Sequence, residues 1–155
     1  MPVQSNGSRS GSGVSRAAAS VAEFHVRFGL HRQAEPNARI DAGVAALRVR
    51  LLEEEVGELA EATDNRDIVE IADALADIVY LAYGAAVTYG IDLDAVFDEV
   101  HRSNMTKLGD DGKPLLREDG KVIKPATFQP PDVKRVLADQ APLPLEAIEL
   151  ASAVG

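Results

Sequence analysis

The chain has 155 residues, of which 46% are apolar and 26% charged, enough for one compact domain with a hydrophobic core. Acidic residues outnumber basic ones by 25 to 16, and the formal net charge of −9 argues against a surface that binds nucleic acid. The chain has no cysteine, which excludes disulfides, thiolate zinc sites and cysteine nucleophiles and favours a cytoplasmic location. A ligand that carries phosphates would need a metal ion to bind so acidic a chain.

Two segments of the chain could be targeting or membrane signals by their position or composition. Residues 1–16 are rich in Ser and Gly and lack the apolar run of a secretory signal, so we expect a disordered N-terminal tail. The longest apolar stretch, near residues 74–91, is interrupted by Asp77 and contains Gly84 and Gly90. This composition favours a buried helix of a soluble protein over a membrane span.

The middle of the chain has helical periodicity. Between Ala17 and Lys107, apolar residues recur at intervals of three and four, which predicts an all-α fold. Asp41 and Asp67 stand where N-caps are needed, and Gly90 stands where a helix would end. The expected helices cover residues 17–29, 41–63, 67–89 and 93–107.

The chain changes character after Leu108. A turn-prone cluster covers residues 109–112, and Asp119-Gly120 separates two short runs, which predicts a β-hairpin flap near residues 113–124. Pro130-Pro131 precedes a last short helix expected over 132–139. We therefore expect a single domain over residues 17–139, followed by a loosely attached C-terminal tail over residues 140–155.

Acidic residues interrupt the apolar face of the helix expected over 41–63. At about 100° per residue, Glu55 and Glu58 fall within that face and Glu54 on its edge, whereas Glu53 points to the polar side. Arg48 is the one base on this helix whose angle matches the acidic side. The run of glutamates is therefore not a uniform solvated stripe.

The next helix repeats this arrangement. Glu70, Asp73 and Asp77 fall along one line with apolar neighbours on both sides. Unpaired buried carboxylates cost several kcal/mol each, so these acids require protonation, basic partners or a bound cation. Because bases are scarce on both faces, we expect a divalent metal. All-oxygen ligands suit Mg²⁺, and Mn²⁺ would accept the same ligands.

These motifs carry a family resemblance. Glu54-Glu55-x-x-Glu58 on one helix, followed by acids ahead of Ile78-Val79-Tyr80 on the next, resembles the MazG-like all-α nucleoside triphosphate pyrophosphohydrolase superfamily. The segment 101–107, His-Arg-Ser-Asn-Met-Thr-Lys, resembles the one that follows in its phosphoribosyl-ATP pyrophosphohydrolase-like and dUTPase-like members. The resemblance covers roughly residues 20–128 and implies a four-helix MazG-like bundle.

The second acidic motif fits the family pattern in two registers. The pattern has a glutamate, two residues and an aspartate. If Asp77 is its aspartate, Ala74 replaces the expected glutamate and Asp73 would have to substitute for it. The pair Glu70 and Asp73 fits literally but shortens the spacing and leaves Asp77 as an extra acid.

The resemblance implies hydrolysis between the α and β phosphates of a nucleoside triphosphate, which yields a monophosphate and pyrophosphate. The implied metal ligands are Glu55, Glu58, Asp73 and Asp77, with Glu54 and Glu70 as further possible ligands. Glu54 corresponds to the first glutamate of the family's pair, and we expect it to accept the proton of the attacking water.

Further residues are expected to bind substrate. Asn104 and Lys107, at i and i+3, are expected to converge on the phosphates, with Arg48 and Arg102 as weaker candidates. The expected flap contacts are Lys121 and Lys124, and the candidate base pocket is Phe24 and His25. Tyr80, Tyr83 and Phe97 are interpreted as helix-packing residues.

The leading interpretation is an enzyme that removes a surplus triphosphate such as dUTP. The alternatives are a phosphoribosyl-ATP pyrophosphohydrolase of histidine biosynthesis and a non-catalytic helical module that binds nucleotide or metal. The resemblance also implies a homodimer or higher homo-oligomer. The helix over 67–89 supports this, because it is apolar over more of its circumference than one neighbour would cover.

Overall fold

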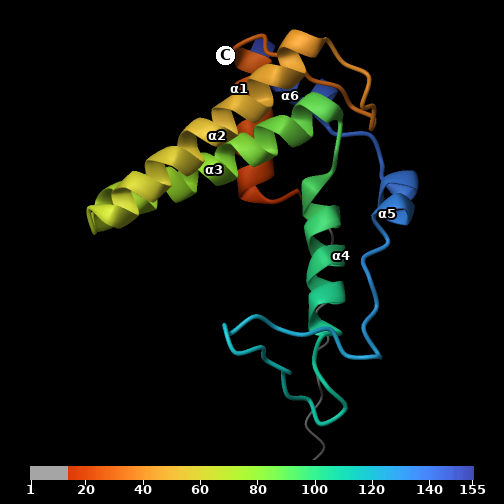
Figure 1. Cartoon of the computed structure of the whole chain (residues 1–155). Helices are drawn as coiled ribbons and strands as arrows, with labels where there is room; N and C mark the ends of the chain where they lie inside the picture. The colour runs from red at the N-terminus through yellow and green to blue at the C-terminus, as the bar shows by residue number, and fades with distance from the viewer. Residues whose placement is uncertain (1–13) are drawn as a thin grey trace, which may run out of the picture.

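The computed structural model describes residues 14–155, so most of the expected N-terminal tail lies outside the described residues. This part of the chain contains six helices and no strand, which confirms the all-α class (Figure 1). The helices are α1 (Arg16–Arg27), α2 (Ala42–Asp64), α3 (Ile68–Tyr89), α4 (Leu93–Met105), α5 (Val133–Asp139) and α6 (Leu145–Ala153).

The first four helices lie where the periodicity placed them, and their ends follow from local chemistry. The Asp41 carboxylate accepts a hydrogen bond from the Val44 N–H at the start of α2. The Asp67 carboxylate likewise accepts from the second and third backbone N–H groups of α3. Both predicted N-caps are thus confirmed, since each carboxylate satisfies first-turn donors that have no partner within the helix.

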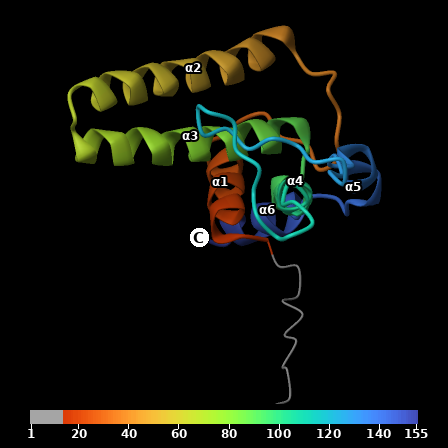
Figure 2. The same cartoon turned by 60° about the horizontal axis from the view of Figure 1, so that its bottom comes forward.

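α2 and α3 form a long antiparallel pair that extends from the rest of the molecule (Figure 1). α1 packs against the C-terminal half of α3, and α6 packs on α1. Ala22, Val87 and Leu145 form the buried core where these three helices meet. α4 leaves this core in another direction and carries α5 on its side (Figures 1 and 2).

The outer half of α3 is weakly covered. Its buried residues gather in the C-terminal half, whereas Ile68, Val69, Leu75 and Val79 are exposed. By length and composition α3 would pass for a membrane span, with 28% of its most apolar window buried, but core helices of soluble proteins pass the same test. The exposed apolar residues show that α2 alone does not cover α3.

The expected β-hairpin flap near residues 113–124 does not form strands, so that prediction was wrong. Two isolated antiparallel bridges, Leu108 with Pro114 and Leu116 with Val122, stand in its place. Residues 110–124 are all exposed, so neither face of the turn region packs on a core. Pro114 also has no N–H to donate to a ladder, and an isolated two-stranded hairpin is marginal in water.

The C-terminal residues differ from the expected loose tail. They contain α6, whose Leu145 is a core residue. The Leu143 N–H donates to the Ala34 carbonyl at 2.8 Å, and Arg32 forms an ion pair with Glu149 at 2.8 Å. The last helix thus closes the core over α1 and the connection that follows it. The short helix expected over 132–139 is confirmed as α5.

Gly90 fixes the connection between α1 and α2 against the end of α3. It has a φ of +74°, and a Cβ at this position would lie 2.1 Å from the Glu35 carbonyl oxygen. The Asn37 N–H donates to the Tyr89 carbonyl beside it at 3.0 Å. The residue must therefore be glycine for two reasons, its backbone conformation and the approach of a second backbone.

We expect Gly90→Ala to lower the free energy of unfolding by more than about 2 kcal/mol, because the methyl group overlaps the Glu35 backbone in a conformation that disfavours a side chain. Gly57→Ala is the matched control. Its Cβ meets nothing within α2's surroundings, and it should raise stability by about 0.5–1 kcal/mol. Urea unfolding followed by circular dichroism measures both, and equal stability of the two variants would contradict the predicted overlap.

Candidate active site

Four of the predicted metal ligands lie across the seam between α2 and α3. Burial raises the pKa of Glu55, and the negative charges of Glu58, Asp77 and Asp73 raise it further. One carboxylate oxygen of Glu55, Oε2, is buried and has no hydrogen-bond partner. Acids from both helices therefore act on one another, as the two sequence patterns predict, and the most enclosed oxygen among them lacks a counter-charge.

The register of the antiparallel pair bears on the two alternatives for α3. Gly84 faces Arg48, since a Cβ on Gly84 would lie 3.1 Å from the Arg48 Nη1. Moving seven residues along each helix, in opposite chain directions, brings Glu55 opposite Asp77. Glu70 lies seven residues from Asp77, about 10.5 Å along the axis, and is exposed near the turn that joins α2 and α3. This placement favours the register of Asp73 and Asp77.

The donor chemistry at the seam fits a hard divalent cation. All four side chains offer carboxylate oxygens, and the unpartnered Oε2 of Glu55 is a buried acceptor with no protein donor. Among residues 14–155, no three His, Asp or Glu side chains stand close enough together to form a ligand set as they are placed. Rotation of the flexible Glu and Asp side chains would be needed to close one.

Glu54 and its neighbour Glu53 are both exposed. Glu54 adjoins Glu55 on the edge of the seam, where solvent reaches its carboxylate, whereas Glu53 lies on the polar side of α2. The position of Glu54 suits a base that takes a proton from water, and Glu53 provides a natural control for it.

A second polar group lies farther along the same seam, where α1 joins α2 and α3. His25 is 2% exposed, and its Nδ1 is 3.1 Å from the His31 carbonyl oxygen. Its Nε2 and the Arg48 Nη1 both approach Gly84, at 3.2 and 3.1 Å from the position of a Cβ. The Arg48 Nε is buried without a partner, and burial lowers the pKa of this guanidinium. Sequence reasoning named Arg48 and His25 separately and missed Gly84, which lets them meet.

Two aromatic residues adjoin this group. Phe24 stacks on Phe28 with ring centroids 4.2 Å apart and meets Tyr80 edge to face at 5.7 Å. Phe24 and Tyr80 are 37% and 38% exposed, so neither residue is fully buried. The packing interpretation of Tyr80 therefore describes only part of its role. The shared face of Asp77, Tyr80 and Gly84, at i, i+3 and i+7, was the available signal.

The other two aromatic interpretations had different outcomes. Tyr83 packs as expected, and its hydroxyl donates to the Asp94 carboxylate at 2.8 Å. Phe97 is 65% exposed, so its assignment as a packing residue was wrong for the single chain. Helical periodicity alone does not show that α4 stands away from α2 and α3.

Asn104 and Lys107 do not join the carboxylates within one chain. They lie at the C-terminal end of α4, which points away from α2 and α3 (Figure 1). Asn104 is exposed, and the Lys107 ammonium lies 5.9 Å from the centre of the Phe128 ring. Lys124 approaches the same ring at 4.9 Å, and Lys121 is exposed in the same connection. These cations form a group of their own, separate from the seam.

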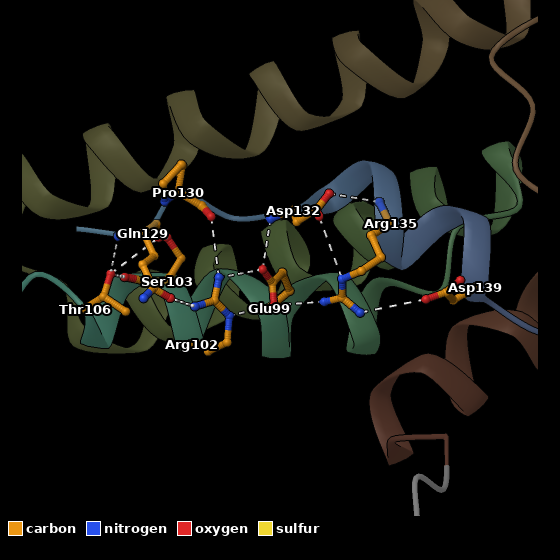
Figure 3. A network of polar contacts seen from close by, with 9 residues as sticks. All are labelled: Glu99, Arg102, Ser103, Thr106, Gln129, Pro130, Asp132, Arg135 and Asp139. Atoms are coloured by element: carbon orange, nitrogen blue, oxygen red, sulfur yellow. Dashed lines mark hydrogen bonds and ion pairs between the residues drawn. The ribbon is translucent and has the colours of Figure 1, made fainter. Parts of the chain in front are cut away.

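Arg102 has a structural role within the single chain, and its contact with phosphate stays a prediction. Its guanidinium donates to both carboxylate oxygens of Glu99, at 2.9 and 2.8 Å, and to the Gln129 side chain at 3.0 Å (Figure 3). A weaker bond at 3.4 Å reaches the Pro130 carbonyl. These bonds use four of the five guanidinium N–H groups and hold Arg102 against Glu99, which is 6% exposed.

The same network fastens residues 129–139 to α4 (Figure 3). Glu99 accepts from the Asp132 N–H at 2.9 Å and lies 3.6 Å from Arg135. Ser103 donates its hydroxyl to the Gln129 carbonyl at 2.7 Å. Glu99 is thus the centre of the network. Sequence reasoning missed it, although its i, i+3 spacing to Arg102 was a usable signal.

A pocket of about 920 Å³ lies apart from the carboxylate seam. It opens between the N-terminal half of α1, the start of α4 and residues 135–148. Its wall is mostly apolar and includes Arg102, but none of Glu55, Glu58, Asp73 and Asp77. Its position gives no reason to place the chemistry there.

An antiparallel helix pair with facing carboxylates defines an all-α protein of the MazG-like kind. Residues 21–104 match the phosphoribosyl-ATP pyrophosphohydrolase family, and the chain belongs to that family. The matched span contains the four carboxylates of the seam as well as His25, Arg48 and Asn104. The family supports a hydrolase that acts on pyrophosphate bonds.

The chain is also similar to a viral protein. It is 31% identical over 126 residues to the uncharacterized protein L479 of Acanthamoeba polyphaga mimivirus. The aligned region covers 76% of this chain and 46% of the viral protein, so the chain spans about half the length of that relative.

The Glu99 network makes the attachment of α5 depend on pH. Hydrogen bonds from Arg102 and from the Asp132 N–H lower the pKa of Glu99 to about 2 from 4.5. Its contribution to stability should therefore be complete above pH 4.5 and disappear as the pH falls toward 2. We expect Glu99→Gln to lose stability less steeply over this range than the parent protein. Thermal unfolding at several pH values measures the slope.

Glu118→Gln, in the exposed connection, is the control and should keep the slope of the parent. Parallel slopes for the parent protein and Glu99→Gln would contradict the assignment.

Proposed function

We propose that the protein is a Mg²⁺-dependent nucleoside triphosphate pyrophosphohydrolase that cleaves between the α and β phosphates and yields a monophosphate and pyrophosphate. The observation that carries this proposal is the buried, unpartnered Oε2 of Glu55 among three further acids from two helices. Membership in a pyrophosphohydrolase family supports the reaction type.

Glu55, Glu58, Asp73 and Asp77 would hold the metal, and Mn²⁺ would suit the same oxygens. A bound Mg²⁺ would offset the charge of the triphosphate against these acidic walls and make a nearby water more acidic. Glu54 accepts the proton of the attacking water at its exposed carboxylate. Asn104 and Lys107 donate hydrogen bonds to phosphate oxygens, and Lys121 and Lys124 add positive charge over the substrate.

We further propose a homodimer in which the end of α4 from one copy reaches the carboxylate seam of the other. Two observations support it. The outer half of α3 exposes apolar residues that α2 does not cover. In addition, Asn104 and Lys107 lie away from the acids within one chain (Figure 1). A second copy would cover the exposed apolar residues of α3. It would also bring its own Asn104 and Lys107 to the carboxylates of the first copy.

The proposed substrate is a surplus triphosphate of the dUTP kind. The matched family favours a second candidate, phosphoribosyl-ATP, whose cleavage would use the same carboxylates. A non-catalytic module that binds nucleotide or metal is the third. Glu54 argues against the third, because binding requires metal ligands but no additional exposed base.

Glu54→Gln tests the catalytic proposal. We expect the parent protein with Mg²⁺ to release pyrophosphate and a monophosphate from at least one member of a panel of canonical and modified triphosphates. The variant should lose about two to four orders of magnitude in kcat, because the amide cannot accept a proton, while Mn²⁺ binding measured by calorimetry stays unchanged.

Glu53→Gln is the matched control and should keep parental turnover. Release of orthophosphate would point to another hydrolase, and full turnover by Glu54→Gln would remove this residue from the mechanism. No turnover on any triphosphate by the parent would favour the binding module.

Mixed dimers test the shared site. Glu55→Gln and Lys107→Ala should each be inactive alone. Coexpressed with different tags and purified through both, they should form dimers with one intact site of two and about half of the parental activity. A mixed dimer of Glu55→Gln and Glu58→Gln has both changes in the same group of residues, so it should remain inactive. An inactive first pair would show that Lys107 acts within its own chain.

A further inference from the structure

The group formed by Arg48, His25 and Gly84 has no part in holding the metal, yet it contains a buried polar atom, the Arg48 Nε, that has no protein partner. Arg48 is half-buried, its Nε is enclosed without a hydrogen bond, and no ion pair was found for its guanidinium within residues 14–155. A buried guanidinium N–H without an acceptor is costly, so the position of the Arg48 Nε favours a ligand that accepts a hydrogen bond.

The His31 carbonyl fixes which nitrogen of His25 carries the proton. A carbonyl oxygen only accepts hydrogen bonds, so the 3.1 Å contact requires a proton on Nδ1. The Thr88 hydroxyl approaches the same carbonyl at 3.5 Å and donates to the Gly84 carbonyl at 2.9 Å. The His31 carbonyl thus contacts side chains of both α1 and α3. Burial lowers the pKa of His25, a hydrogen bond to His31 opposes this, and the charge of Arg48 lowers the pKa further.

The neutral ring therefore presents a lone pair at Nε2 beside the donors of Arg48. A phosphate oxygen would suit Arg48 but would oppose the Nε2 lone pair, because ionised phosphate only accepts hydrogen bonds. A ring N–H next to a carbonyl satisfies both, the N–H donating to Nε2 and the carbonyl accepting from Arg48. Cytosine and adenine present the opposite pattern, with a ring nitrogen that accepts and an amino group that donates.

The distance to the acids suits a nucleotide bound along the seam. Arg48 precedes Glu55 by seven residues on α2, and Gly84 follows Asp77 by seven on α3, which is about 10.5 Å along each axis. This is the scale that separates the phosphates of a nucleotide from the far edge of its base. Phe24 precedes His25 on α1 and Tyr80 lies one turn before Gly84 on α3, so two partly exposed aromatic residues stand next to the group in the sequence of each helix.

We infer that Arg48 and His25 contact the base of the substrate and select one whose edge carries a carbonyl oxygen beside a ring N–H, as in uracil, thymine, guanine or hypoxanthine. The inference rests on the proposed function for the phosphate end of the site. It assigns Arg48 to the base, whereas from the sequence we expected Arg48 to contact the phosphates. It also favours a dUTP-like substrate over phosphoribosyl-ATP, whose adenine-derived ring lacks that carbonyl.

The test measures binding and turnover separately, so that base selection by Arg48 and His25 can be contradicted independently of the proposed reaction. Binding is measured by calorimetry with Mg²⁺ and the α,β-imido analogues of dUTP, dTTP and dCTP, which the proposed reaction does not cleave. We expect the parent protein to bind the dUTP analogue at least about tenfold more tightly than the dCTP analogue. Arg48→Ala should abolish that preference, losing about ten- to a hundredfold for dUTP and much less for dCTP.

Gly84→Ala provides a gentler second variant in case Arg48→Ala fails to fold. Its methyl group would lie 3.1 Å from the Arg48 Nη1 and 3.2 Å from the His25 Nε2, so both groups must shift by a few tenths of an ångström and the preference for uracil should fall. Because Ala is the better helix former, the midpoint of thermal unfolding should fall less than in Arg48→Ala. Arg50→Ala, at an exposed position on α2, is the matched control and should keep the preference of the parent.

Three outcomes would overturn the inference. They are equal binding of the two analogues by the parent protein, an equal loss for every base in Arg48→Ala, and an unchanged preference in Gly84→Ala. The second would assign Arg48 to the phosphates. A uracil preference in binding without pyrophosphate release from dUTP would support the assignment of Arg48 and His25 to the base and would overturn the proposed reaction.

Discussion

The antiparallel pairing of α2 and α3 is the constraint on which the candidate site depends. It sets Glu55 opposite Asp77 and Arg48 opposite Gly84 by one register, so the acidic and basic groups are fixed relative to each other. The Asp67 cap and the short connection before it establish that register close to the turn. A change of register at the turn would therefore separate both groups together.

The two ends of the seam are electrostatically opposite. Four carboxylates lie toward the hairpin turn, and a guanidinium lies where α1 joins the pair. Each end contains one buried polar atom without a partner, the Oε2 of Glu55 and the Nε of Arg48, and such an atom is costly unless a ligand or ion satisfies it. The proposed ligand, a nucleotide with a metal-bound phosphate group at one end and a neutral polar base at the other, would satisfy both atoms, whereas a metal ion alone would satisfy only the first.

Sequence periodicity predicted the four main helices and their caps because those depend on neighbours within one or two turns. It also predicted inward-facing acids on α2 and α3, but only Glu55 and Asp77 are half-buried, whereas Glu58 and Asp73 are exposed. The register of the pair then separated Asp77 from Glu70. What it could not indicate was long-range: that Arg102 is held by segment 129–132, that Phe97 stays exposed, and that α6 returns to the core. Those outcomes depend on which part of the chain covers which face, and local patterns do not specify that.

The ion pair between Arg32 and Glu149 joins positions 117 residues apart in the sequence. Arg32 follows His31, whose carbonyl determines the tautomer of His25, so the last helix braces the backbone that sets the proton on an interior imidazole. Removing the last helix would therefore take away one support of the backbone that contacts a buried histidine, even though that helix forms no hydrogen bond with the ring itself.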